Sequence, residues 1–233
     1  MLVLRIEDLD RDRCRPEFTA ALEKDLRWFG LEWQEGPFVQ SERRAVYLEA
    51  WEKLRASGFI YPCTCSRRDV LAAAGAPHGE GDEPLYPGTC RGRTSNATQP
   101  TGVNWRFHVP DGEQLQFTDE ILGQQTAVAG THFGDFLVWR KDDVPSYQLA
   151  VTADDLAMGI TEVVRGADLL MSTFRQLLLY RALGAKAPRF CHTPLVADSS
   201  GRRLAKRDAA LSLRALRAGG ASPGELRARH LPP

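Results

Sequence analysis

The stretch YQLAVTADDLAMGITEVVRGADLLMSTFRQLLLYRALG, residues 147–184, decides the fold class that the sequence predicts. Its segment TEVVRG (161–166) predicts a strand. Ser172 is the predicted N-cap of a helix that stops at Gly184 and carries Phe174, Leu177, Leu178 and Leu183. HTPLV (192–196) predicts the next strand. Strand, helix and strand in this order are typical of an α/β protein.

The N-terminal part shows the same alternation. LVLRI (2–6) predicts a buried strand. A helix follows from Pro16 to Gly30, with an apolar stripe of Phe18, Leu22, Leu26 and Phe29. A second helix is predicted from an N-cap at Ser41 to Gly58, with a stripe of Tyr47, Ala50, Trp51 and Leu54. FIY (59–61) then predicts a short strand, and we expect these strands to form a parallel sheet.

The middle of the chain has a different pattern. Residues 75–103 are rich in Gly, Pro, Thr and Ser and predict a loop. From Val103 to Val109 apolar and polar residues alternate, and LQFTD, TAVAG and FLVWR continue as short strands. We therefore expect a catalytic domain in two parts, 1–62 and 143–233, around a β-rich insertion at 63–142. The last 25 residues or so predict one weak helix and a tail.

The composition is that of an ordinary soluble protein, with 43% hydrophobic and 26% charged residues. No N-terminal apolar run is long enough for a signal peptide or membrane span, so we expect a cytoplasmic protein. The net charge of zero does not by itself indicate a nucleic-acid partner. Five cysteines, an odd number without regular spacing, argue against a secreted disulfide scaffold.

Three of these cysteines predict a metal site. Cys63 and Cys65 form a close pair, and Cys90 lies across the loop with Tyr86 four residues before it. Zinc takes four tetrahedral ligands, so the fourth is Tyr86 or His78. Simple chemistry favours His78, because a tyrosine phenol with a pKa near 10 must first lose its proton to the metal. Two alternatives remain: small core cysteines without a metal, and a catalytic cysteine, for which no partner histidine stands at an obvious spacing.

Four blocks of sequence carry a resemblance to a known family. They are LRIEDLDRDR (4–13), the cysteine pieces (63–90), the stretch at 147–184, and HTPLVADSSGRRLAKRD (192–208). In this order they resemble the catalytic domain of glutamyl-tRNA synthetases. They resemble more closely the short paralogues, the glutamyl-queuosine tRNA(Asp) synthetases. The resemblance implies an α/β fold, a class I synthetase Rossmann-type parallel sheet with a β-rich zinc-containing insertion.

Two features favour the short paralogues. The chain ends about 25 residues after RRLAKRD, which leaves no room for the helical anticodon-binding domain of a full synthetase. The pattern Cys-x-Cys…Tyr-x3-Cys also resembles that of the paralogues, in which the tyrosine is a ligand. The resemblance thus implies a closed, structural zinc site made of Cys63, Cys65, Tyr86 and Cys90.

The implied activity is a two-step ligation. Glutamate and ATP, with Mg2+, give glutamyl adenylate and pyrophosphate. The glutamyl group then passes to the queuosine base in the anticodon of tRNA(Asp). The family suggests a monomer.

The resemblance also implies substrate residues. Glu7, after the first strand, would hold the ammonium group of glutamate, and Arg165 its side-chain carboxylate. Tyr147 would lie beside the substrate. The simpler alternatives are a surface acid, a salt bridge from Arg165 to Asp168, and a core aromatic residue.

Lys206, in RRLAKRD (202–208), matches the second lysine of the KMSKS-type loop. It would bind ATP and stabilise charge on the phosphates during adenylate formation, as a catalytic residue. Arg203 replaces the first lysine and Ala205 the usual serine; the alternative is a solvated basic turn. Asp154 and Asp155 match the family without an assigned role, and they could bind magnesium or cap a helix.

One family segment has no counterpart here. The family begins with a strand and turn of the form RFAPSPxGxLHxG, which carries the HIGH-type ATP-binding residues, whereas Met1 stands three residues before LRIED. We expect either a start codon assigned too late or a degenerate paralogue, and little ATP–pyrophosphate exchange by the 233-residue product. The alternatives are a fragment of a full glutamyl-tRNA synthetase and a non-catalytic, zinc-stabilised tRNA-binding module.

Overall fold

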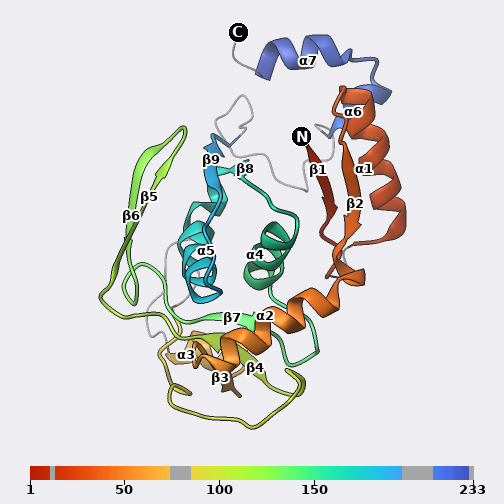
Figure 1. The fold of residues 1–233 in the computed structure, drawn as a ribbon. Helices are drawn as coiled ribbons and strands as arrows, with labels where there is room; N and C mark the ends of the chain where they lie inside the picture. Colours follow the sequence, from red (N-terminus) through yellow and green to blue (C-terminus); the bar gives the residue numbers. More distant parts are fainter. Residues whose placement is uncertain (11–13, 74–84, 196–211, 231–233) are drawn as a thin grey trace. The chain divides into compact units, whose positions relative to one another are not determined.

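A computed structural model describes residues 1–10, 14–73, 85–195 and 212–230 (Figure 1). The chain separates into two compact units, one made of Met1–Arg43 with Leu195–Pro233 and the other of Arg44–Pro194. The predicted domain limits at 62 and 142 stay a prediction. No helix in the described residues is long and apolar enough to cross a membrane.

The first unit contains a parallel pair of strands joined by a helix. Strand β1 (Val3–Ile6) pairs with β2 (Glu35–Val39), and α1 (Pro16–Phe29) connects them. As predicted, α1 begins at Pro16 and ends at Gly30, whose left-handed φ of 87° suits glycine. Strand β2 was not predicted, because its sequence EGPFV contains glycine and proline, which weaken the strand signal.

Short helical segments complete this unit. The 3-10 turn η1 (Gln40–Glu42) follows β2, and α6 (Leu213–Ala218) and α7 (Pro223–His230) lie near the C-terminus. The single weak helix predicted there is therefore two helices. Ser41 belongs to η1 and does not cap a helix, because its amide and hydroxyl both bind the Asp8 carboxylate, at 2.8 and 2.6 Å.

The second unit begins with α2 (Arg44–Ala56), β3 (Ile60–Cys63) and α3 (Arg67–Ala73). Strand β3 forms an antiparallel sheet with β4 (Asn104–Phe107) and β7 (Phe136–Trp139), in the order β3-β4-β7. The expectation that residues 59–61 extend the parallel sheet of residues 2–6 is therefore wrong. Trp51 of α2 packs edge-on against Trp105 of β4, with ring centroids 5.0 Å apart, so the apolar stripe of α2 covers this antiparallel sheet.

A mixed four-stranded sheet has the order β6-β5-β9-β8. Strands β5 (Gln114–Asp119) and β6 (Gly123–Val128) form an antiparallel hairpin, and β8 (Glu162–Gly166) pairs in parallel with β9 (Arg189–Thr193). The strand predicted at 192–196 thus begins and ends earlier. Strand β5 touches β9 through one parallel pair, Asp119 with Phe190, so the predicted insertion joins the second catalytic part directly (Figure 1).

Three further helical elements lie in this unit: α4 (Tyr147–Ala157), the 3-10 turn η2 (Ala167–Leu169) and α5 (Leu170–Ala182). Ser146 caps α4 by accepting a hydrogen bond from the Leu149 amide at 3.3 Å. Ser172 lies inside α5, two residues beyond its start, and is not its cap.

Candidate functional site

The three predicted cysteine ligands come together in the structure. Cys63 ends β3, Cys65 lies just beyond it, and Cys90 lies in a loop, yet their three Sγ atoms are within 4.8 Å of one another. The Tyr86 hydroxyl lies 3.3 Å from Cys63 Sγ and 3.5 Å from Cys65 Sγ, and the Cys65 and Cys90 sulphurs are 3.6 Å apart. Within the described residues this is the one cluster of candidate metal ligands.

Three of these spacings match tetrahedral zinc. With Zn–S bonds of about 2.3 Å, two sulphurs of a tetrahedron lie roughly 3.8 Å apart, and a sulphur and an oxygen ligand roughly 3.5 Å apart. The Cys65–Cys90 separation of 3.6 Å and the Tyr86 separations of 3.3 and 3.5 Å agree with this. The donor set of three thiols and a phenol therefore fits a zinc ion.

Hydrogen bonds in the cluster favour the anionic form of Cys90 but not of Tyr86. Burial opposes ionisation of the Cys90 thiol, but donors around its sulphur, including the Tyr86 hydroxyl and the Thr64 amide, outweigh it and bring its pKa to about 6. Burial raises the pKa of the Tyr86 phenol, as do its contacts with the three thiols. Ionisation of Tyr86 therefore requires a cation nearby, although the Cys90 amide already donates to its oxygen at 2.9 Å.

Arg106 supplies positive charge beside this cluster. Its Nε donates to Cys63 Sγ at 3.3 Å, and its guanidinium carbon lies 4.0 Å from the centre of the Tyr86 ring. Its Nη1 donates to the Asp135 backbone carbonyl at 3.1 Å. Arg106 thus offsets negative charge on both kinds of ligand.

Asp135 organises the surrounding network. Its fully buried carboxylate accepts hydrogen bonds from the Tyr61 hydroxyl, the Val109 amide at 2.9 Å, and Arg91 Nε and Nη2 at 2.7 Å each. These bonds raise the pKa of Arg91, so the pair stays ionised. Burial and the Asp135 carboxylate raise the pKa of the Tyr61 phenol, which therefore stays a proton donor.

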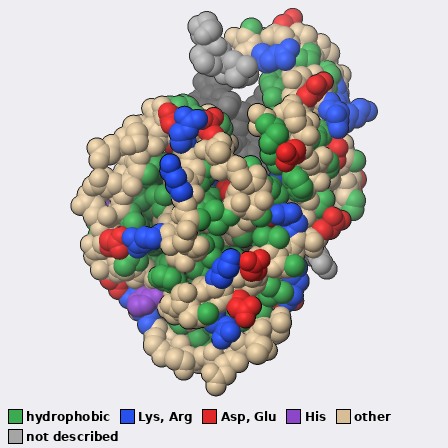
Figure 2. Space-filling view, in the orientation of Figure 1, with side chains coloured by type: hydrophobic (Ala, Val, Ile, Leu, Met, Phe, Trp, Pro, Cys, Tyr) green, Lys and Arg blue, Asp and Glu red, His purple; other side chains and the backbone are tan. Residues whose placement is uncertain are grey.

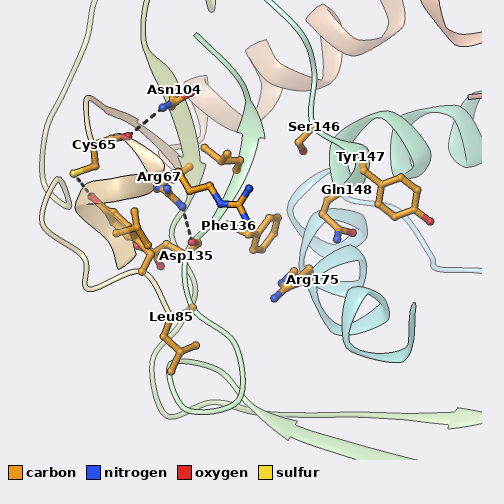
Figure 3. Close-up of a pocket in the computed structure, with 15 residues that line it drawn as sticks. Cys65, Arg67, Leu85, Asn104, Asp135, Phe136, Ser146, Tyr147, Gln148 and Arg175 are labelled. Atoms are coloured by element: carbon orange, nitrogen blue, oxygen red, sulfur yellow. Dashed lines mark hydrogen bonds between the residues drawn. The ribbon is translucent and has the colours of Figure 1, made fainter. Parts of the chain in front are cut away.

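A cavity of ≈650 Å³ lies beside the cluster (Figure 3). Cys65 and Arg67 line one side of it, and the start of α4 with Tyr147 and Gln148 lies on the other side. Arg175 of α5 also lines it, which gives the cavity a basic character.

On the molecular face that Figure 2 shows, basic and acidic side chains are interspersed, in agreement with the zero net charge.

Arg165 is held by neighbours in the mixed sheet. It lies in β8 directly opposite His192 of β9, and its Nε donates to His192 Nε2 at 3.1 Å. Its Nη2 donates to the Thr173 hydroxyl at 2.7 Å, and its guanidinium carbon lies 5.3 Å from the Phe190 ring centre. In the described residues Arg165 therefore contacts His192 and Thr173 and forms no salt bridge with Asp168.

The other predicted substrate residues divide between the units. Glu7 follows β1, as expected, with its side chain 42% exposed and bound by Arg5 Nη2 at 3.0 Å. Tyr147 is the first residue of α4 and is 38% exposed. Glu7 belongs to the first unit, and Tyr147 and Arg165 belong to the second. Lys206 and the loop at 202–208, like His78, lie outside the described residues.

Asp154 and Asp155 have structural contacts. Asp154 accepts a hydrogen bond from the Tyr47 hydroxyl at 2.9 Å and Asp155 from the Tyr180 hydroxyl at 3.0 Å. Both are buried in α4, and neither belongs to a cluster of candidate metal ligands in the described part of the chain. The acidic pair therefore connects α4 to α2 and α5.

Sequence reasoning missed the residues that support the site. Arg106, Asp135, His192 and Asp119 received no role, although all are buried and hydrogen-bonded. The available signal was a polar residue at a position that alternates with buried apolar ones, such as His192 two residues after Phe190. That signal marks burial but does not identify the partner.

The fold and this site define a class of protein. The chain belongs to the family described as tRNA synthetases class I (E and Q), catalytic domain, whose model matches residues 1–227. The expected resemblance to glutamyl-queuosine synthetases is thereby confirmed within a family of tRNA ligases.

The chain is also similar to individual proteins of this family. The chain is 49% identical to a glutamyl-Q tRNA(Asp) synthetase of Symbiobacterium thermophilum, over 95% of this chain and 72% of that protein. It is 42% identical to glutamate–tRNA ligase 1 of Halorhodospira halophila, over 91% of this chain but 47% of that protein.

A solved structure shares this fold. It is a glutamate tRNA ligase from Elizabethkingia meningosepticum in complex with its amino acid, with a TM-score of 0.73 and 27% identity. The match covers 88% of this chain and 45% of that one, so the chain spans less than half of the ligase.

Proposed function

We propose that this protein activates glutamate with ATP and transfers the glutamyl group to queuosine in the anticodon of tRNA(Asp). One observation carries the proposal: the 49% identity to a glutamyl-Q tRNA(Asp) synthetase extends over 72% of that relative's length. The protein acts as a cytoplasmic monomer on glutamate, ATP with Mg2+ and tRNA. No step requires a membrane partner.

The proposed chemistry distributes roles over a few residues. A carboxylate oxygen of glutamate attacks the α-phosphorus of ATP and expels pyrophosphate; the acyl group then passes to queuosine and AMP leaves. Arg165 binds the side-chain carboxylate of glutamate, Glu7 its ammonium group, and Tyr147 lies beside the substrate. Lys206 binds ATP and stabilises the phosphate charge that develops in the first step.

Zinc has a structural role in this proposal. Cys63, Cys65, Tyr86 and Cys90 fill all four tetrahedral positions, which leaves none for a substrate. When bound, the ion holds the end of β3 to the loop that carries Tyr86 and Cys90.

Transfer of labelled glutamate tests the proposal. The protein, expressed from its complete gene, is incubated with glutamate, ATP and one of three RNAs: queuosine-containing tRNA(Asp), queuosine-lacking tRNA(Asp), or tRNA(Glu). We expect labelling of the queuosine-containing tRNA(Asp) alone, together with glutamate-dependent ATP–pyrophosphate exchange. Binding of RNA without exchange or transfer would instead indicate a non-catalytic tRNA-binding protein.

A second candidate function is aminoacylation of a glutamate tRNA. The 42% identity to glutamate–tRNA ligase 1 of Halorhodospira halophila favours it. Labelling of tRNA(Glu) at its 3′ end, rather than of tRNA(Asp), would establish this alternative.

A further inference from the structure

We infer that Asp119 and His192 form a positioning pair that fixes the guanidinium of Arg165 for a substrate carboxylate. The identity of that substrate rests on the proposed function, whereas the arrangement itself rests on contacts within one unit. Asp119 ends β5, His192 lies in β9, and Arg165 lies opposite it in β8 (Figure 1).

The hydrogen bonds determine the tautomer of His192. An arginine Nε only donates, so the contact from Arg165 Nε at 3.1 Å requires a lone pair on His192 Nε2. The proton must then lie on Nδ1, which donates to Asp119 Oδ2 at 2.6 Å. Both side chains are fully buried, so water does not compete for these bonds.

Asp119 also accepts hydrogen bonds from three backbone amides. Its Oδ1 accepts from the Leu122 amide at 2.9 Å and the Ile121 amide at 3.1 Å, and the His192 amide lies 3.1 Å from Oδ2. Burial alone would raise the pKa of this carboxyl, but these donors together lower it to about 2. The group facing the imidazole is therefore a carboxylate, which accepts only.

This arrangement leaves one edge of Arg165 for a ligand. The described contacts occupy Nε and one hydrogen of Nη2, the latter through the Thr173 hydroxyl at 2.7 Å. The Phe190 ring, 5.3 Å from the guanidinium carbon, restricts rotation without using a donor. Nη1 and the second hydrogen of Nη2 form a two-donor edge, which suits a carboxylate.

Asp119→Asn would move the imidazole proton of His192 from Nδ1 to Nε2. The asparagine oxygen would still accept the Leu122 and Ile121 amides, which directs its NH2 group at His192 Nδ1. The imidazole proton would then move to Nε2, where it faces the Arg165 Nε donor and can be accepted only by the Thr173 hydroxyl, 3.1 Å away. Arg165 Nε and the protonated Nε2 repel each other, so Arg165 would lose its bond to His192 and with it its fixed orientation, while the hairpin keeps its backbone hydrogen bonds.

The test combines nitrogen NMR of His192 with calorimetric titration of L-glutamate, using the full protein. In the unsubstituted protein we expect a protonated Nδ1 and a hydrogen-bonded Arg165 Nε–H. Asp119→Asn should move the proton to Nε2 and weaken glutamate binding about tenfold or more. Thr173→Val, which removes the hydroxyl but keeps the volume, should weaken binding by a similar factor. The neighbouring Glu120→Gln is the matched control and should change neither readout.

Two results would overturn the inference. One is a proton on Nε2 in the unsubstituted protein, a measurement that does not depend on the folding of any variant. The other is an Asp119→Asn protein with the moved proton and unchanged glutamate affinity. Failure of the unsubstituted protein to bind glutamate would contradict the proposed function instead, and the NMR signals of His192 and Arg165 would then decide the inference.

Discussion

At the residue scale, Tyr86 and His78 are the two candidates for the fourth metal ligand. Sequence chemistry favoured His78 as the fourth ligand, and the family resemblance favoured Tyr86. The Tyr86 oxygen lies within 3.5 Å of two of the cysteine sulphurs and accepts the Cys90 amide, which supports Tyr86 as the proposed fourth ligand. A histidine ligand would have to displace this phenol, which is buried and stacked under Arg106.

Substitution of the ligands tests the metal site. We expect one zinc per chain in the unsubstituted protein by metal analysis, and loss of zinc in Cys90→Ala, because three ligands do not close a structural site. Tyr86→Phe should weaken zinc binding by a factor of about ten or more. His78→Ala is the control and should retain the metal. If His78→Ala removes the zinc and Tyr86→Phe does not, the ligand assignment is wrong.

Asp135 and Asp111 provide a matched pair of substitutions, because both bind Arg91. The Asp135 carboxylate is fully buried, and its loss leaves the Arg91 charge and the Tyr61 hydroxyl poorly paired. Asp135→Ala should therefore lower the free energy of unfolding by about 3–5 kcal/mol. Asp111 is 52% exposed, so Asp111→Ala should lower it by about 1 kcal/mol or less. Urea unfolding measures both, and equal effects would contradict the central role of Asp135.

The lowered pKa of the Asp119 carboxyl predicts that the folded protein loses stability in acid. Its folded pKa of about 2 lies below the ordinary 3.8, because hydrogen bonds to the carboxylate outweigh burial. The native state therefore binds a proton at Asp119 less readily than the unfolded state does. This contributes about 2 kcal/mol to the free energy of unfolding above pH 4, and the contribution disappears as the pH falls through 2. Asp119→Asn should flatten the unfolding free energy between pH 5 and 2. Glu113→Gln, at an exposed ion pair with Arg181, should leave that slope nearly unchanged.

At the element scale, helix α4 is attached to both neighbouring helices through consecutive acids. Tyr47 of α2 donates to Asp154, and Tyr180 of α5 donates to Asp155. Consecutive residues of a helix point about 100° apart, so two adjacent acids can contact helices on two different sides. Two acids four residues apart would lie on the same face and could contact only one of them. The start of this helix carries Tyr147, so the same contacts fix the position of a proposed substrate residue.

Removal of either tyrosine hydroxyl should weaken this attachment. Tyr47→Phe and Tyr180→Phe are each expected to lower the free energy of unfolding by about 1–2 kcal/mol, because a buried carboxylate loses a donor. Chemical denaturation measures the change. Combining Tyr47→Phe with Asp154→Asn should cost less than the sum of the two single changes, whereas full additivity would show that the two groups do not interact.

Elements with a strong local signal were predictable. The proline start and glycine stop of α1 proved correct, as did the strands LQFTD and TEVVRG apart from their limits. The apolar stripe of α1 is not buried as its spacing suggests, because Phe18 and Leu22 are 51% and 45% exposed. Strand β2 was missed because its signal is weak locally and its partner β1 lies about thirty residues away. The antiparallel pairing of β3 was also missed, because a short apolar strand does not reveal the direction of its neighbour.

At the scale of the whole molecule, the candidate metal ligands were easier to predict than the buried residues that hydrogen-bond to the site. Cysteine spacing restricts chemistry, so the sequence alone pointed to the cluster of Cys63, Cys65 and Cys90. The contacts of Arg165 with His192 and of His192 with Asp119 connect residues 27 and 73 positions apart. Such contacts depend on strand order, which the sequence did not show, and the roles of Arg106 and Asp135 depend on it in the same way.

Metal removal tests how far the cluster stabilises the molecule. The proposed zinc joins the end of β3 to the loop with Tyr86 and Cys90, so its binding energy is folding energy for that part of the second unit. Chelation should speed hydrogen exchange in residues 60–66 and 85–93. Helix α1 belongs to the other unit and should keep its exchange rates.

Two cysteines outside the cluster provide the controls for this experiment. Cys14→Ser and Cys191→Ser should each retain zinc and the same response to chelation, because neither sulphur belongs to the cluster. A general effect of thiol loss would instead appear in these variants as well. If full removal of zinc leaves exchange in residues 60–66 and 85–93 unchanged, the hydrogen bonds among Cys63, Tyr86 and Cys90 hold this region by themselves, and the metal has no structural role in it.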